Sequence, residues 1–134
     1  MGQMAIHHIC IQTNVYAESL AFYTNVLPFM LVQEEPNFHG RAYNTWLQLG
    51  HFYIELQTAK HGEQLQSASE RGEGIVHFCL WVEDLQAEVE RIKTCGAQFK
   101  LKDGVEIYEV AGGQLCKIIA PEGTVIELRT NIGF

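Results

Sequence analysis

The chain has 134 residues, which is enough for one ordinary domain with a buried core. Hydrophobic residues make up 47% of it and charged residues 19%, so the composition excludes disorder, a fibrous repeat and a coiled coil. The net charge of −7 and the scattered Lys and Arg argue against nucleic acid as a partner, because phosphate binding needs a basic surface. No apolar run approaches the ~20 residues of a membrane span, so we expect a small-molecule ligand and no membrane partner.

The first half of the chain predicts the order strand, helix, strand, strand, strand. Residues 6–12 are rich in β-branched side chains, and Asn14 is placed to cap a helix over residues 16–27 that Pro28 ends. Turn residues at 36–40 and a break at Gly50 then separate three further strands, which we expect near residues 29–34, 42–49 and 52–58.

The second half repeats this order after a polar, glycine-punctuated linker over residues 59–74. Asp84 is placed to cap the second helix, and Gly96 stands where a helix end favours a left-handed residue. The strands of this half are expected near residues 75–82, 97–101, 115–119 and 124–130.

The repeat is visible in the residues themselves. The segment Ile6-His7-His8-Ile9-Cys10-Ile11 aligns with Ile75-Val76-His77-Phe78-Cys79-Leu80, and Tyr53-Ile54-Glu55-Leu56 aligns with Val125-Ile126-Glu127-Leu128. Such a duplication has to be recognised before any other fold assignment. We therefore predict an α+β fold, a single domain of two βαβββ modules over residues 4–58 and 75–130, whose mixed sheets curve into a cup.

The duplicated strands place two histidines and two glutamates at matching positions. Because side chains alternate across a strand, His8, Glu55, His77 and Glu127 all fall on the face away from the helices. A single strand histidine is usually structural, but two imidazoles and two otherwise unpaired carboxylates at duplicated sites favour a shared counter-charge. The prediction is one divalent metal, and this ligand set suits zinc, nickel, iron, cobalt or manganese better than calcium.

The same alternation places further side chains on the face that carries the predicted metal ligands. Arg129 could bind a substrate carboxylate or form a charge pair at the rim, and Trp81, Tyr53 and Gln57 could line a pocket or serve packing. Cys10 and Cys79 share this face and are interpreted as small fillers rather than ligands. His7 is expected to face the helix layer, although a register error of one residue would exchange it with His8.

The four cysteines show no Cys-x-x-Cys spacing, and the chain opens without the pattern of a secretory leader. We therefore expect reduced thiols and a cytoplasmic protein.

At these positions the sequence resembles the vicinal oxygen chelate superfamily over nearly its whole length. The resemblance is carried by the opening His-His-Ile-Cys-Ile, by Phe22-Tyr23 with Leu27, by Ile54-Glu55-Leu56, by the His77 strand, and by Pro121-Glu122-Gly123 ahead of Ile126-Glu127-Leu128. Matched by motif, the family's four ligand positions fall on His8, Glu55, His77 and Glu127. This His, Glu, His, Glu order is the pattern of bacterial lactoylglutathione lyases, whereas epimerases of the family usually carry Gln where Glu55 stands.

The resemblance implies a metal-dependent lyase or isomerase that acts on a thiol hemithioacetal, or a related α-hydroxycarbonyl compound, through a metal-stabilised enediolate. Glu127 would be the principal base, with Glu55 able to serve the opposite face, and a low-molecular-weight thiol would be the co-substrate. Gln12 stands where such lyases tend to carry Arg, and Ala59 where they tend to carry Asn, two positions associated with glutathione, so Gln12 is a candidate substrate contact and the thiol stays open. Alternatives are a thiol transferase, a dioxygenase, an epimerase, or a metal-free antibiotic-binding protein. A homodimer is expected.

Overall fold

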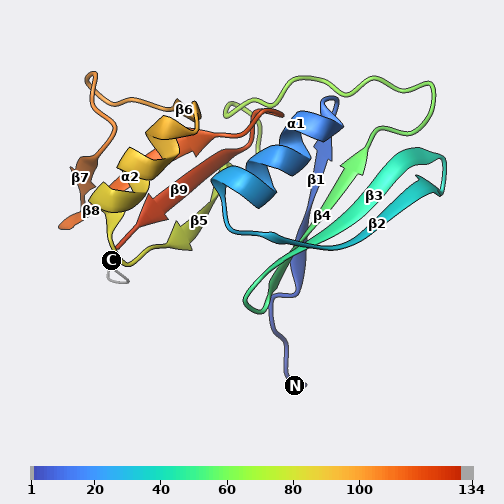
Figure 1. Cartoon of the computed structure of the whole chain (residues 1–134), viewed down its shortest axis with the longest axis horizontal. Helices are drawn as coiled ribbons and strands as arrows, with labels where there is room; N and C mark the ends of the chain where they lie inside the picture. Colours follow the sequence, from blue (N-terminus) through green and yellow to red (C-terminus); the bar gives the residue numbers. More distant parts are fainter. Residues whose placement is uncertain (1, 131–134) are drawn as a thin grey trace. The chain divides into compact units, whose positions relative to one another are not determined.

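The structure, a computed structural model, describes residues 2–130 and has an α+β fold (Figure 1). The first half contains β1 (His8–Thr13), α1 (Tyr16–Ala21), the π-helical turn η1 (Phe22–Val26), β2 (Met30–Phe38), β3 (Arg41–Leu49) and β4 (Phe52–Thr58). The second half contains β5 (His77–Trp81), α2 (Leu85–Thr94), β6 (Gln98–Phe99), β7 (Tyr108–Val110), β8 (Gly113–Ile119) and β9 (Val125–Arg129). The predicted α+β class and the repeated element order are confirmed.

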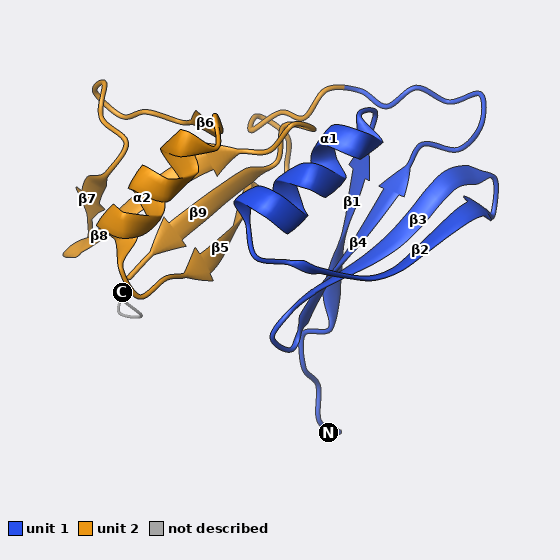
Figure 2. Cartoon of the chain, viewed as in Figure 1, with its two compact units in different colours: residues 1–66 blue, residues 67–134 orange. Residues whose placement is uncertain are grey.

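Two compact units divide the chain, one ending at Gln66 and the other beginning at Ser67 (Figure 2). The sheet of the first unit has the strand order β1-β4-β3-β2, and that of the second has the order β5-β9-β8-β6, with β7 also paired to β8. In each unit the first strand lies parallel to the last, and the neighbouring strands are antiparallel. The two sheets are therefore mixed and carry the same local topology.

The parallel pair has the same register in both units, and this register positions the candidate site. In the first unit His8 is paired with Tyr53 and Cys10 with Glu55, and in the second His77 is paired with Val125 and Cys79 with Glu127. Each histidine consequently stands two residues before the partner of its glutamate.

The start of the first helix differs from the prediction. The expected cap by Asn14 is wrong, because α1 has Val15 at its N-cap with no side-chain hydrogen bond there, and the hydroxyl of Thr13 instead accepts a bond from the Val15 N–H at 2.9 Å. The side chain of Asn14 exchanges hydrogen bonds with the backbone of Leu65. After Ala21 the backbone widens into a π-helical turn, and the element ends at Val26, just before the predicted limit.

The second helix follows the sequence signals closely. The Asp84 carboxylate accepts a hydrogen bond from the Ala87 N–H at 3.1 Å, and Gly96, just beyond the C-cap, has a φ of 75°. Strand β7 was not predicted, since its three residues are too short to show a periodicity.

The core of each unit lies on the sheet face opposite the candidate ligands. Ile54 and Leu56 on β4 are fully buried, as are Ile126 and Leu128 on β9, with relative exposures of 1% or less. Burying each of these side chains contributes about 1.5–3 kcal/mol, so the register that turns them inward is strongly favoured. The intervening glutamates are thereby directed to the other face.

Residues 59–74, the predicted linker, are divided between the two units. Within the first unit His61 donates its backbone N–H to the Gly40 carbonyl at 2.7 Å, and within the second Glu70 forms an ion pair with Lys100. No helix among residues 2–130 has the length and apolar character needed to cross a membrane.

Candidate functional site

The first pair of predicted ligands meets on the open face of the first sheet. His8 opens β1 and Glu55 lies in the middle of β4, and the Nε2 atom of His8 is 3.7 Å from Oε1 of Glu55. The glutamate side chain is 19% exposed and the histidine 37%, so this pair is reachable from solvent. A metal ion or substrate can therefore approach both groups.

The second pair reproduces this arrangement in the second sheet. The Nε2 atom of His77 on β5 is 3.5 Å from Oε1 of Glu127 on β9. Glu127 is more deeply placed than its counterpart, with a relative exposure of 7%. The duplication seen in the sequence is thus a duplication of side-chain geometry.

Both separations suit two ligands of one divalent cation. Bonds of about 2.1 Å place adjacent ligand atoms roughly 3.0 Å apart in octahedral and roughly 3.4 Å apart in tetrahedral geometry. The observed 3.7 Å and 3.5 Å lie slightly above these values and beyond the usual range of a hydrogen bond. Side-chain movements of a few tenths of an ångström bring each pair to bonding geometry, so the residues present fit a metal.

Each unit supplies a pair of these ligands. Over residues 2–130 the structure contains no cluster of three or more His, Cys, Asp or Glu side chains that could hold a metal. The prediction that all four ligands share one cation therefore remains a prediction.

A network of amide side chains holds Glu55. The Asn44 amide on β3 donates to Oε2 of Glu55 at 3.1 Å, and its carbonyl oxygen accepts from Nε2 of Gln57 at 2.7 Å. Asn44 is 1% exposed, so both bonds are shielded from water. Because this bond uses Oε2, the other oxygen of Glu55 is left facing His8.

Charged groups, rather than amides, surround Glu127. Nε of Arg129 lies 3.7 Å from Oε2 of Glu127, and Lys117 on β8 is the cross-strand partner of Glu127. Nε of Arg129 is buried and has no hydrogen-bond partner in the described part of the chain. Basic side chains thus lie next to Glu127, whereas amide side chains hold Glu55.

The thiols beside the two glutamates are held in their protonated form. Burial and the neighbouring Glu55 carboxylate raise the pKa of Cys10 to about 11, and burial with Glu127 raises the pKa of Cys79 to about 12. Both are cross-strand partners of the glutamates. A protonated thiol is a poor metal ligand, which agrees with their interpretation as filler.

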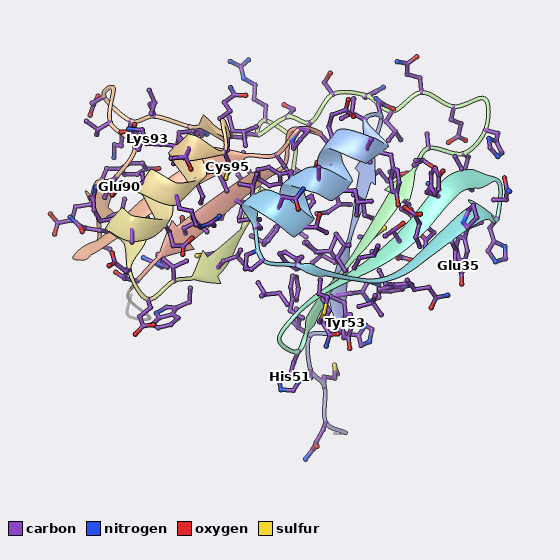
Figure 3. The ribbon with its side chains drawn as sticks, in the orientation of Figure 1. Glu35, His51, Tyr53, Glu90, Lys93 and Cys95 are labelled. Carbon is purple, nitrogen blue, oxygen red and sulfur yellow. The ribbon has the colours of Figure 1, made fainter. Side chains whose placement is uncertain are left out.

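The predicted substrate-contact residues occupy distinct surroundings. Gln12 accepts a hydrogen bond from Nη1 of Arg41 at 3.0 Å, and Tyr53, labelled in Figure 3, stacks on His7 with the ring centroids 5.0 Å apart. Trp81 is 57% exposed and donates its indole N–H to the Thr130 carbonyl. Because Trp81 is so exposed, a packing role is disfavoured. Trp81 therefore stays a candidate for the wall of a pocket.

The sequence pattern did not predict the positions of three residues at the first pair. Asn44 and Trp46 lie on β3, and their place beside Gln57 and Glu55 follows only from the register of β3 with β4. His7 was expected to face the helix layer, and this is wrong, because its ring packs on Tyr53 and its Nδ1 lies 2.9 Å from Nδ1 of His8. The reason is that β1 begins at His8, so strand alternation does not govern His7.

Comparisons with known proteins agree with this fold. Residues 7–116 match the family model described as the glyoxalase/bleomycin resistance protein/dioxygenase superfamily. None of the curated proteins matches the sequence significantly.

Solved structures with the same fold share little sequence with the chain. A glyoxalase/bleomycin resistance protein/dioxygenase domain from Frankia sp. has a TM-score of 0.79 at 18% identity, with 97% of this chain and 99% of that chain covered. A lactoylglutathione lyase from Agrobacterium tumefaciens has a TM-score of 0.72 at 16% identity, with both chains fully covered. A fosfomycin resistance protein from Listeria monocytogenes, complexed with Mn(II) and a dihydroxypropylphosphonic acid, has a TM-score of 0.74 at 15% identity, covering 97% and 94%.

Proposed function

Since this chain belongs to the glyoxalase/bleomycin resistance protein/dioxygenase superfamily, we propose that it is a metal-dependent lyase or isomerase. Its substrate class would be a thiol hemithioacetal or a related α-hydroxycarbonyl compound. The observation that carries the proposal is the duplicated His–Glu pair, with Nε2–Oε1 separations of 3.7 Å and 3.5 Å. Two such pairs supply the four ligands of one zinc, nickel, cobalt, iron or manganese ion.

In this proposal both His–Glu pairs bind the same cation. The two pairs come either from one chain or from the two chains of a homodimer. Each pair alone offers two protein ligands, fewer than the three or four that zinc sites use.

The chemistry that the bound cation supplies is that of a Lewis acid, which stabilises the negative charge that develops on substrate oxygens during proton transfer. Glu127 takes the proton from one carbon and returns it to the adjacent carbon. Glu55 serves the opposite face of the substrate, and its bond from Asn44 at 3.1 Å fixes the direction of its free oxygen. A base works only within hydrogen-bond reach of the proton it moves, so this fixed direction matters for catalysis.

The charged surroundings of Glu127 support an anionic substrate. Arg129 lies beside Glu127 on β9, and Lys117 lies directly across from it on β8. The positive charge of these two side chains would attract a substrate carboxylate or phosphate. Gln12 and Gln57 on the first sheet offer neutral hydrogen bonds to the remainder of the substrate, and Tyr53 and Trp81 offer aromatic surface.

The first experiment measures the metal content of protein purified without chelators. We expect about one divalent metal per chain in the wild type and its loss in His77→Ala, with His51→Ala as the control on an exposed turn. Absence of any bound or titratable metal would favour a metal-free binding protein, which a drug-binding titration then detects.

The second experiment offers methylglyoxal together with glutathione and other low-molecular-weight thiols to the metal-loaded protein. Isomerisation with at least one thiol is the expected result. Metal binding without turnover on any thiol would overturn the lyase assignment and favour a thiol transferase, an epimerase or a dioxygenase. We also propose a cytoplasmic homodimer, which size-exclusion chromatography with light scattering tests directly.

A further inference from the structure

Three charged side chains stand in one row across the second sheet. The pairing of β6 with β8 continues one residue beyond β6, where the Lys100 N–H donates to the Lys117 carbonyl at 2.8 Å. Lys117 is in turn the cross-strand partner of Glu127 on β9. Because cross-strand partners point to the same face of a sheet, Lys100, Lys117 and Glu127 share the face that carries the second His–Glu pair.

The two lysines of this row are an unfavourable pair unless an anion accompanies them. Like charges directly opposite each other on neighbouring strands destabilise a sheet. Glu127 is the one carboxylate of the row, and it stands against Lys100, Lys117 and the neighbouring Arg129. The row therefore favours a second negative group next to the lysines.

Glu70 supplies this second negative group. It lies on residues 67–74, the first segment of the second unit (orange in Figure 2). Both carboxylate oxygens of Glu70 accept hydrogen bonds from Nζ of Lys100. These bonds, followed by the charges of Lys100 and Lys117, hold the pKa of Glu70 below its usual range. The carboxylate therefore lies in the field of both lysines.

The segment that carries Glu70 is lightly attached to its unit. Every residue from 67 to 74 is exposed, and the Glu70 side chain is 43% exposed. In the described part of the chain, the bonds from Lys100 are the hydrogen bonds that join this segment to the body of the unit. Ala68 adds a contact at Gly123, where a Cβ would stand 2.9 Å from Cβ of Ala68. An exposed ion pair contributes little stability, so Glu70 can leave Lys100 at small cost.

We propose that Lys100 and Lys117 form a binding subsite for a carboxylate or phosphate group of a small-molecule ligand, and that Glu70 occupies this subsite until the ligand displaces it. The inference deepens the proposed function and rests on it for the kind of ligand, whose anionic end would lie beside the second His–Glu pair. Lysine suits this role, because its ammonium offers three donors and a compact charge to an oxyanion.

A ligand can displace Glu70 because it can reach both lysines. Among the described contacts, Glu70 bonds to Lys100 and not to Lys117. An oxyanion placed between the two ammonium groups gains a second charge-assisted hydrogen bond that Glu70 lacks. It also separates the two like charges, which the exposed carboxylate does from one side only.

The test is a titration of the protein with inorganic phosphate at constant ionic strength, followed by the amide signals in NMR spectra. In the wild type we expect saturable shifts at Lys100 and Lys117, together with shifts at Glu70 as its segment is released. Glu70→Gln should tighten phosphate binding about two- to fivefold, the range expected when an exposed ion pair stops competing. Lys117→Gln should weaken binding about tenfold or more, the size of a lost hydrogen bond to a charged group.

Glu106→Gln is the matched control. Glu106 also forms an exposed ion pair in the second unit, with Nζ of Lys93 at 2.8 Å, but Lys93 lies on α2 rather than in a cross-strand pair of lysines. Its phosphate affinity should equal that of the wild type. Circular dichroism establishes that each variant is folded, and a repeat of the titration with a chelator should give the same affinities.

The inference is overturned if phosphate causes no saturable shift at the two lysines, if Glu70→Gln leaves the affinity unchanged, if Glu106→Gln tightens binding as much as Glu70→Gln, or if the chelator abolishes binding. Failure of the proposed function is a separate result, because the titration requires neither a metal nor turnover. A chain that binds phosphate at these lysines but isomerises no hemithioacetal keeps the subsite and loses the lyase assignment.

Discussion

Glu127 lies two residues beyond the β-bridge partner of His77, and this diagonal step across the parallel strands β5 and β9 brings Oε1 to 3.5 Å from Nε2. His8 and Glu55 are related by the same step across β1 and β4. A shift of either register by one residue would turn the glutamate into the apolar core, so core packing and ligand placement are set together.

Replacing Glu127 with Gln is expected to lower kcat about 10²- to 10⁴-fold, the usual contribution of a general base, on the substrate that the thiol screen identifies. Glu55→Gln should lower kcat less, because Glu127 is the principal base in the proposed reaction. Glu109→Gln, on exposed β7, is the control. A larger loss in Glu55→Gln than in Glu127→Gln would reverse the two roles, and metal analysis of each variant separates loss of the base from loss of the ligand.

Asn44→Ala is expected to lower the free energy of unfolding by about 1–3 kcal/mol, measured by urea titration. The substitution leaves Oε2 of Glu55 and the amide of Gln57 without their shared partner at a site that is 1% exposed. Gln48→Ala is the matched control on the same strand, because its bond to the Gly50 carbonyl is exposed. Equal stabilities of the two variants would show that the buried network contributes nothing.

The four cysteines should differ in their rates of alkylation near pH 8, since the thiolate is the reactive form. The pKa of Cys10 is raised from 9.0 to about 11, which lowers its thiolate fraction roughly 100-fold. The pKa of Cys79 is raised from 9.0 to about 12, which lowers its thiolate fraction roughly 1,000-fold. Exposed Cys95 is expected to react first, and buried Cys116 last. Mass spectrometry of peptides after timed alkylation measures the order, and modification of Cys79 as fast as Cys95 would contradict it.

Thiol ionisation also predicts a loss of stability in alkali. Burial raises the pKa of Cys116 to about 12 in the folded protein, so between pH 9 and pH 12 the unfolded chain loses this proton while the folded chain keeps it. The free energy of unfolding should therefore fall as the pH rises through this window, and it should fall less steeply in Cys116→Ala. The slope of urea midpoints against pH measures the difference, and identical slopes would refute a raised pKa.

Gly123→Ala is expected to destabilise the protein more than Gly112→Ala. Both glycines have positive φ values, 96° and 79°, so each substitution carries a left-handed strain of about 1–2 kcal/mol. A Cβ at Gly123 would in addition stand 2.9 Å from Cβ of Ala68, whereas nothing lies within 4 Å at Gly112. Urea titration measures the difference, and adding Ala68→Gly to Gly123→Ala should bring its loss to that of Gly112→Ala. No recovery in the double variant would rule out the contact as the cause.

The sequence by itself determined the α+β class, the repeat, the face on which His8, Glu55, His77 and Glu127 lie, and the cap of α2 at Asp84. These features depend on local periodicity and on short-range hydrogen bonds, which a pattern of residues records directly.

Only the tertiary structure decided which side chains surround these ligands. Asn44 meets Glu55 through the register of β3 with β4, and Asn14 contacts Leu65 rather than capping α1. His7 meets His8 because the strand begins one residue later and releases the His7 ring onto Tyr53. Such contacts join residues that are distant in the sequence or free of strand alternation, so their geometry is fixed by how the chain packs rather than by any local pattern.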